Sequence, residues 1–176
     1  DYAELLSLPG RVTRMAEFAH STLPKLDLDQ RLLLAKAVIS RFADLHDIRV
    51  AHRDIGEHSL WLDRPSRVIM SGFPAAYYPD PELKALGTFR ERVQVEQARL
   101  PEDAKANAQA TPYRRDVFML GAVLHVILLG ARAAKSDGIY QWQAPAEDPF
   151  GGNLNDFFAQ ALDADPAKRF KNAREM

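Results

Sequence analysis

The sequence predicts a mainly α-helical domain with one short β-hairpin near its middle. Two long stretches repeat apolar residues at helical spacing, and two short apolar runs between them are separated by turn-forming residues. A length of 176 residues suits one well-buried domain. The apolar fraction of 47% and the charged fraction of 27% are typical of a soluble globular protein.

Composition excludes several classes of function. A formal net charge of -1 gives no electrostatic reason for this domain to bind nucleic acid or a membrane surface. The chain has no cysteine, which excludes disulfides, thiolate chemistry and cysteine-bound zinc. The longest apolar stretch, residues 117–129, is interrupted by His125 and is too short to cross a bilayer. We therefore expect a cytoplasmic protein that contacts neither nucleic acid nor membrane.

The first third of the chain predicts two helices. Residues 11–23 show a weak helical pattern that stops before a proline. Asp27, followed three residues later by Gln30, resembles a capping box and predicts the start of a stronger helix. This helix should end near His46, and its apolar stripe comprises Leu34, Val38, Phe42 and Leu45. Residues 48–50 then indicate a short extended segment.

The middle of the chain combines a hairpin with a long irregular segment. The apolar runs 60–62 and 68–70 flank the turn-forming residues 63–66, a pattern that predicts two antiparallel strands. Residues 74–110 show no sustained period. A segment of that length without regular structure, inside a compact domain, usually carries function or moves.

The last third begins with a strongly apolar helix. Thr111, followed by proline, predicts its start, and Gly130 closes the stretch 114–129. Because this helix is apolar nearly all round, we expect it to be buried. Residues 131–152 are expected to be rich in loops, with little regular structure. A final amphipathic helix should contain Leu154, Phe157, Phe158, Ala161 and Leu162.

The tripeptide His52, Arg53 and Asp54 places an imidazole, a permanent cation and a carboxylate between the second helix and the hairpin. A carboxylate held in a tight loop by such neighbours suits a proton acceptor. A solvated polar loop without chemistry is the alternative.

Four separated segments, in the right order, resemble the C-terminal lobe of a protein kinase. They are the His-Arg-Asp loop at 52–54, Ser-Gly-Phe at 71–73 in place of Asp-Phe-Gly, Arg-Asp-Val-Phe-Met-Leu-Gly at 115–121, and Asp-Pro-Ala-Lys-Arg-Phe at 165–170. Together they cover most of the chain. The resemblance implies one kinase-like large lobe over residues 1–176.

The same resemblance divides this lobe into parts. Residues 1–3 look like the tail of the hinge, with Ala3 beside the adenine site. Residues 52–59 correspond to the catalytic loop, 71–102 to the activation segment and 114–129 to the buried central helix. The small lobe, with its Gly-rich loop and phosphate-pairing lysine, would precede these residues and is absent from this chain.

By resemblance, Asp54 would accept the proton of the substrate hydroxyl, with His52 and Arg53 as its neighbours in the catalytic loop. The two positions that usually hold metal ligands carry Ser59 and Ser71. A serine hydroxyl is neutral, whereas Mg²⁺ prefers carboxylate and phosphate oxygens. A full-length protein could still bind ATP and Mg²⁺, but we expect no cofactor for this stretch of chain and no metal ligand among its residues.

Two further positions of the resemblance differ from the kinase pattern. The lysine expected two residues after the catalytic aspartate is Gly56. Trp61 stands where kinases place an aliphatic floor under the adenine base, and strand alternation directs it away from Leu60 and Leu62. Its indole could fill the space of the purine, or it could pack beneath a small lobe.

Other charged residues are expected to hold the fold. Glu102 and Arg169 should form a buried ion pair, and Asp116 should hydrogen-bond the backbone around His52 and Arg53. His46, His52 and His58 do not share a face at metal-ligand spacing, so no metal site is expected from them. His125 should be an imidazole whose hydrogen bonds are satisfied within the core.

Three hypotheses of function follow. The first is a pseudokinase that binds or regulates a protein partner within a larger bacterial protein. The second is an active, divergent serine/threonine kinase that acts on a protein substrate, with Glu57 or Asp63 supplying the metal ligands. The third is an unrelated helical interaction domain, which would lack the hairpin at 60–70.

Overall fold

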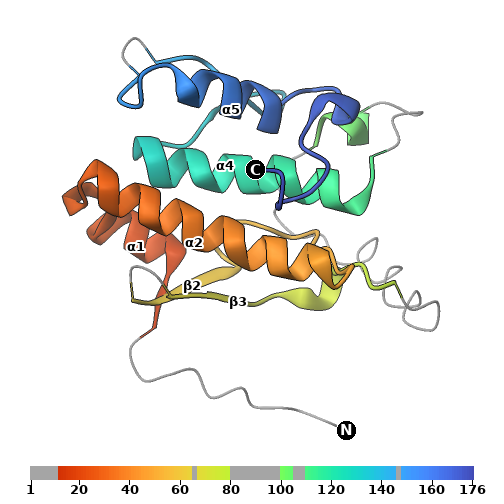
Figure 1. The fold of residues 1–176 in the computed structure, drawn as a ribbon, viewed down its shortest axis with the longest axis horizontal. Helices are drawn as coiled ribbons and strands as arrows, with labels where there is room; N and C mark the ends of the chain where they lie inside the picture. Colours follow the sequence, from red (N-terminus) through yellow and green to blue (C-terminus); the bar gives the residue numbers. More distant parts are fainter. Residues whose placement is uncertain (1–11, 65–66, 80–99, 105–109, 146–147) are drawn as a thin grey trace, which may run out of the picture.

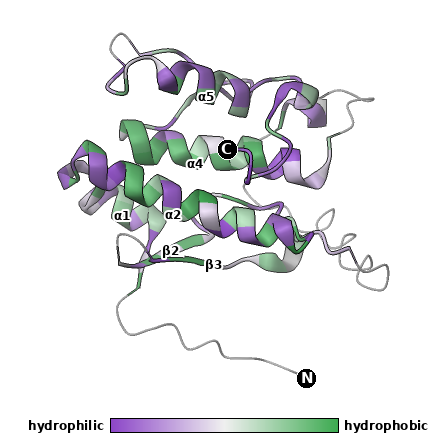
Figure 2. Ribbon diagram, viewed as in Figure 1, coloured by the Kyte–Doolittle hydropathy of each residue, from purple (hydrophilic) through white to green (hydrophobic). Residues whose placement is uncertain are grey.

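The computed structural model describes residues 12–64, 67–79, 100–104, 110–145 and 148–176. Its central element is helix α4 (Pro112–Leu129), which lies between α2 (Leu28–Asp47) and α5 (Asn153–Ala161) (Figure 1). Every residue from 116 to 128 is buried, and α4 is hydrophobic along most of its length (Figure 2). The apolar faces of α2 and α5 therefore share one core with α4.

Local sequence signals explain both ends of α4. The Thr111 hydroxyl accepts a hydrogen bond from the Arg114 backbone N–H at 3.3 Å, and proline occupies the first turn. Gly130 ends the helix in the left-handed region, with a φ of 70°. The helix thus spans the range 114–129, in which the sequence predicts a buried helix.

Helix α2 starts with the predicted capping box. The Asp27 carboxylate accepts from the Gln30 backbone N–H at 2.8 Å, and the Gln30 side chain accepts from the Asp27 N–H at 3.1 Å. Its predicted apolar stripe is buried, and the helix ends at Asp47 as expected. The weaker pattern before it yields only the short helix α1 (Met15–Ser21), followed by the 3₁₀ turn η1 (Leu23–Lys25).

The predicted hairpin is present and gains a third strand. Strands β2 (Leu60–Arg64) and β3 (Arg67–Met70) are antiparallel, and β1 (Thr13–Arg14) pairs with the other edge of β2. Leu60 and Leu62 are 0% and 3% exposed, whereas Trp61 lies on the opposite face and is half-buried. This sheet packs beneath α2 (Figure 1). The hairpin argues against the hypothesis of an unrelated helical domain.

The structure differs from one local prediction and adds detail to another. Residues 48–50 do not form an extended segment, because the chain turns after α2 with Arg49 at a φ of 63°, and only Ala51 pairs, with Tyr77. Residues 131–152 hold little regular structure in their described part, as predicted, but β4 (Ala134–Ser136) and β5 (Ile139–Gln141) form a short antiparallel hairpin that the sequence did not indicate. Its turn places residues 137 and 138, an Asp-Gly pair, at positive φ, which is the conformation that this dipeptide favours.

Three short 3₁₀ turns complete the described structure, η2 (Phe73–Ala75), η4 (Pro101–Ala104) and η5 (Pro166–Lys168). None of the helices in the described ranges has the length and hydropathy needed to cross a membrane. Ala3, with the expected hinge at 1–3, and most of the expected activation segment at 71–102 lie outside the described residues.

Candidate functional site

The loop that follows α2 is held from below by the carboxylate of Asp116 on α4. Its two oxygens accept backbone hydrogen bonds from His52 at 2.6 Å and from Arg53 at 2.7 Å, as the sequence predicts. Asp116 is fully buried, and Arg53 has a φ of 64°, an unfavourable conformation for a residue with a side chain. The two hydrogen bonds fix this strained backbone at the start of the loop.

His46 is a third partner of Asp116, which the sequence did not indicate. Its Nε2–H donates to Asp116 at 3.1 Å, while its Nδ1 accepts from the backbone N–H of Ala173 at 3.0 Å. His46 follows Phe42 by four residues, so it continues the apolar stripe of α2. That position on a buried face was the signal for a structural role, and the residue links α2, α4 and the C-terminal segment.

His52 joins the loop to the Ser-Gly-Phe segment. Its Nε2–H donates to the Ser71 carbonyl at 2.8 Å, and its Nδ1 accepts from the Asp54 N–H at 3.3 Å. The ring is fully buried and lies 4.7 Å from the ring of Phe73. Burial lowers the pKa of His52 below its usual 6.5, so the imidazole is neutral at pH 7. The structure therefore brings the 52–54 loop and the 71–73 segment together.

The Asp54 carboxylate lies beside an imidazole. Nε2–H of His58 donates to its Oδ1 at 3.1 Å, and the Asp54 side chain is 11% exposed. This hydrogen bond raises the pKa of His58 above 6.5. Sequence spacing alone indicated no role for His58, and the structure places it in hydrogen-bond contact with the predicted proton acceptor.

Ser59 turns its hydroxyl back into the loop. The Oγ accepts from the Gly56 backbone N–H and donates to the Gly56 carbonyl, both at 3.1 Å. Ser59 is 1% exposed, and its carbonyl accepts from the Ser71 N–H at 2.9 Å. The hydroxyl at this metal-ligand position therefore closes a tight turn of the backbone.

Ser71 is bound by the indole of Trp61. The Trp61 Nε1–H donates to the Ser71 Oγ at 2.9 Å, and this hydroxyl also lies 3.4 Å from the Ser59 carbonyl, to which it can donate. The guanidinium of Arg14, on strand β1, lies 4.8 Å above the indole. The Trp61 side chain thus contacts Ser71, the second residue that the kinase resemblance places at a metal-ligand position.

The carboxylates named as replacement ligands have cationic partners. Glu57 forms two hydrogen bonds with Arg132, at 2.8 and 3.2 Å, and Asp63 accepts from Arg67 at 3.0 Å. Among the described residues, no group of three or more His, Asp or Glu side chains could hold a metal ion. The side chains that the structure describes around this loop therefore do not fit a magnesium site of the kinase type.

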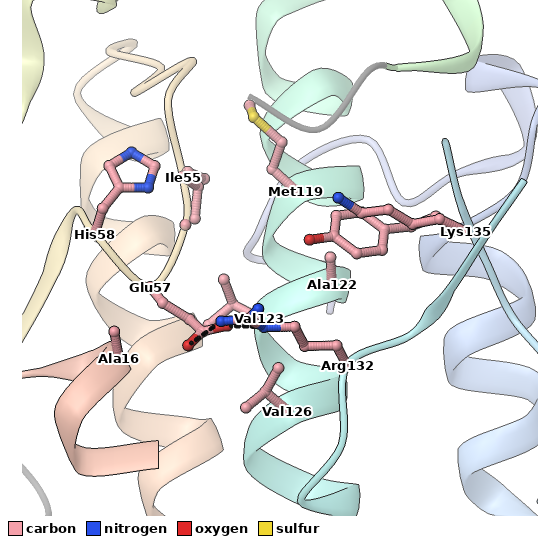
Figure 3. Close-up of a pocket in the computed structure, with 12 residues that line it drawn as sticks. Ala16, Ile55, Glu57, His58, Met119, Ala122, Val123, Val126, Arg132 and Lys135 are labelled. Atoms are coloured by element: carbon pink, nitrogen blue, oxygen red, sulfur yellow. Dashed lines mark hydrogen bonds and ion pairs between the residues drawn. The ribbon is translucent and has the colours of Figure 1, made fainter. Parts of the chain in front are cut away.

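A cavity of about 560 Å³ adjoins the loop. Ile55 and His58 lie on one side of it and Lys135 on the other, with residues of α4 between them and the Glu57–Arg132 pair at one end (Figure 3). The α4 wall consists of Met119, Ala122, Val123 and Val126. The cavity therefore combines an apolar wall with charged ends.

Away from the loop, the predicted ion pair between Glu102 and Arg169 is present. The carboxylate accepts two hydrogen bonds from the guanidinium, at 2.8 and 3.1 Å, and the two side chains are 1% and 0% exposed. Arg169 also donates to the Asp163 carbonyl and lies 4.6 Å above the Phe118 ring. The pair ties η4 to α4 and the C-terminal segment.

His125 has the environment expected of a core imidazole. Its Nδ1–H donates to the Ala131 carbonyl at 2.6 Å, and its ring contacts those of Trp142 and Phe158. Burial lowers the pKa of His125. The residue therefore stabilises the chain between α4 and the second hairpin.

The chain is similar to viral protein kinases over part of its length. It is 29% identical over 126 residues to the serine/threonine-protein kinase US3 homolog of bovine herpesvirus 1.2 (strain ST), covering 69% of this chain and 26% of that protein. It is 26% identical over 121 residues to the homolog of equine herpesvirus 1 (strain Ab4p), covering 69% and 30%. The chain thus spans less than a third of the length of these relatives. No family model matches it.

These distant similarities, together with a helical fold that carries small antiparallel sheets, support a protein-kinase-like domain.

Proposed function

We propose that this chain is the large lobe of a pseudokinase, a kinase-like module that binds or regulates a protein partner without transferring phosphate. Phosphoryl transfer depends on metal ions that bridge and neutralise the phosphates. The observation that carries the proposal is that both serines at the metal-ligand positions use their hydroxyls inside the protein, Ser59 with Gly56 and Ser71 with Trp61.

The contacts expected to hold a kinase-like fold are present, whereas the two predicted metal-ligand positions carry serines. Asp116 anchors the loop, and the Glu102–Arg169 pair holds η4 against α4. Both arrangements maintain a surface of defined shape whether or not the protein catalyses a reaction. This combination favours a module selected for binding. A larger bacterial protein in the cytoplasm remains our predicted setting, and the relatives named above are viral.

An active, divergent serine/threonine kinase is the second candidate. The retained Asp54, in a loop fixed to α4, supports it, as do relatives whose names describe serine/threonine-protein kinases. This candidate requires metal ligands from elsewhere. Glu57 and Asp63 would have to leave Arg132 and Arg67 to serve.

Phosphate incorporation separates the two candidates. The full-length protein would be incubated with radiolabelled ATP, Mg²⁺ or Mn²⁺, and a generic protein substrate, beside the Asp54→Asn variant as the matched control. We expect no difference between the two proteins, because neither carries the anionic ligands that a metal needs. Incorporation by the wild type that disappears in Asp54→Asn would establish the active kinase.

A further inference from the structure

Position 56 requires glycine because the neighbouring His58 ring leaves no room for a side chain, and not because of its backbone conformation. Gly56 is outside the left-handed region, so other residues could adopt its backbone angles. A Cβ atom built there would lie 2.6 Å from both Cε1 and Nδ1 of the His58 ring. A side chain at 56 and the observed position of His58 therefore exclude each other.

The His58 ring that fills this space makes a directed contact. Its Nε2–H points to the Asp54 carboxylate at 3.1 Å, and its side chain is 49% exposed, so water reaches one edge of the ring. By the kinase resemblance, position 56 is where a lysine would place its ammonium near Asp54. The imidazole reaches the same carboxylate from two residues further along the loop.

We propose that the His58 ring occupies the space beside Asp54 that the kinase resemblance assigns to the catalytic-loop lysine, that it donates a hydrogen bond to the Asp54 carboxylate, and that Gly56 is the residue that makes room for it. His58 is thus a positioning residue that holds the Asp54 carboxylate. The comparison with the lysine rests on the proposed kinase-like loop, whereas the contact among the three residues does not.

The charge of the His58 ring depends on pH, unlike that of a lysine. Asp54, by its hydrogen bond and its charge, and Glu57, by its charge, raise the pKa of His58, while burial and the guanidinium of Arg14 on β1 lower it. His52, the neighbouring imidazole, is buried and neutral. The hydrogen bond to Asp54 is the strongest of these effects, so His58 keeps its proton to a higher pH than an exposed histidine.

Titration of the five histidines by NMR tests the contact directly. The His58 signal is assigned by its loss in His58→Gln. We expect a titration midpoint above 6.5 in the wild type, and a lower midpoint in both Asp54→Asn and Gly56→Ala, because the first removes the acceptor and the second displaces the ring. His20, which is exposed on α1, provides the reference signal. A His58 midpoint that neither substitution changes would overturn the proposal.

A double-mutant cycle tests the exchange of histidine for lysine. Gly56→Lys should lower the thermal midpoint in the wild-type background, because the new side chain meets the His58 ring. The same substitution should lower it less in a His58→Ala background, where the space is open. An equal loss in both backgrounds would show that the two residues do not share this space.

The titration and the mutant cycle test the contact of His58 with Asp54, whereas the phosphate assay tests the proposed pseudokinase, so one hypothesis can fail while the other stands. A coupled His58 in a protein that transfers phosphate would refute the pseudokinase and leave this inference standing. An uncoupled His58 in an inactive protein would do the reverse.

Discussion

Asp116 shows how one side chain determines the geometry of the candidate site. It is fully buried, yet its carboxylate is satisfied by two backbone N–H groups and by His46. Hydrogen bonds to a buried charge are stronger than those between neutral groups, and their loss leaves the donors without partners. The conformation of the loop therefore depends on this single residue.

Replacing Asp116 by alanine should destabilise the protein by about 3–5 kcal/mol, because three buried donors lose their acceptor. Urea unfolding followed by circular dichroism measures this loss. Asp103→Ala is the matched control, since its side chain is 42% exposed and its pair with Arg115 should contribute less than about 1 kcal/mol. Equal losses in the two variants would show that the loop does not depend on Asp116.

Trp61 has a predicted effect on nucleotide binding. If its indole excludes the purine, the full-length protein should bind ATP poorly, and Trp61→Leu in that protein should restore binding of the base without restoring phosphoryl transfer. Titration of a fluorescent ATP analogue measures this. Trp61→Phe is the informative companion, because it keeps a large ring but removes the N–H that binds Ser71. Tight binding by the wild type that is unchanged in both variants would show that Trp61 leaves the pocket open.

At the scale of elements, the Glu102–Arg169 pair holds three segments together. We expect Arg169→Ala to cost about 3–5 kcal/mol, because the buried Glu102 would lose its two hydrogen bonds from Arg169 and keep only Arg115, at 3.6 Å. Thermal or urea unfolding gives the value. The control is Arg174→Ala, whose pairs with Asp44 and Asp47 are exposed to solvent, so this substitution should cost much less than Arg169→Ala. A cost under about 1 kcal/mol for Arg169→Ala would contradict the burial of the pair.

The elements that sequence predicts well are those with local signals. The capping box at Asp27 and the closing Gly130 define α2 and α4 because the responsible contacts lie within a few residues. The second hairpin was missed because its strands are short and largely exposed, without the alternation that marks a buried face. Strand β1 has two residues, so only its pairing with β2 identifies it.

In the candidate site, too, some features could be predicted from the sequence and others depend on contacts formed only after folding. The order of motifs along the chain was sufficient to place His52, Arg53 and Asp54 near Ser71. The contacts of Trp61 with Ser71, and of His58 with Asp54, depend on where side chains point after folding, which no short pattern encodes.

At the scale of the whole molecule, pH acts on three histidines with opposite signs. Burial lowers the pKa of His52 and His125, so their contribution to stability is lost as the pH falls below about 6.5. Asp54 raises the pKa of His58, so that contribution is complete below about 6.5 and is lost as the pH rises through the raised value. His58 therefore offsets part of the acid destabilisation.

Replacing Asp54 by asparagine should change how the stability of the protein depends on pH. Between about pH 7.5 and about pH 5.5, the thermal midpoint of Asp54→Asn should fall more than that of the wild type, because the gain from protonating His58 is absent. Scanning fluorimetry across this range gives both slopes. A smaller fall in the variant than in the wild type would reverse the sign assigned to His58.

The overlap between position 56 and the His58 ring also constrains how this loop can change by single substitutions. While His58 lies against Asp54, any side chain introduced at 56 displaces it, so introducing the lysine that the kinase resemblance implies at 56 produces a protein in which the two side chains compete for one space. The path without that competition changes His58 first and Gly56 second. A side chain at position 56 is therefore tolerated only after His58 has been replaced. As long as His58 is present, the loop favours glycine at position 56.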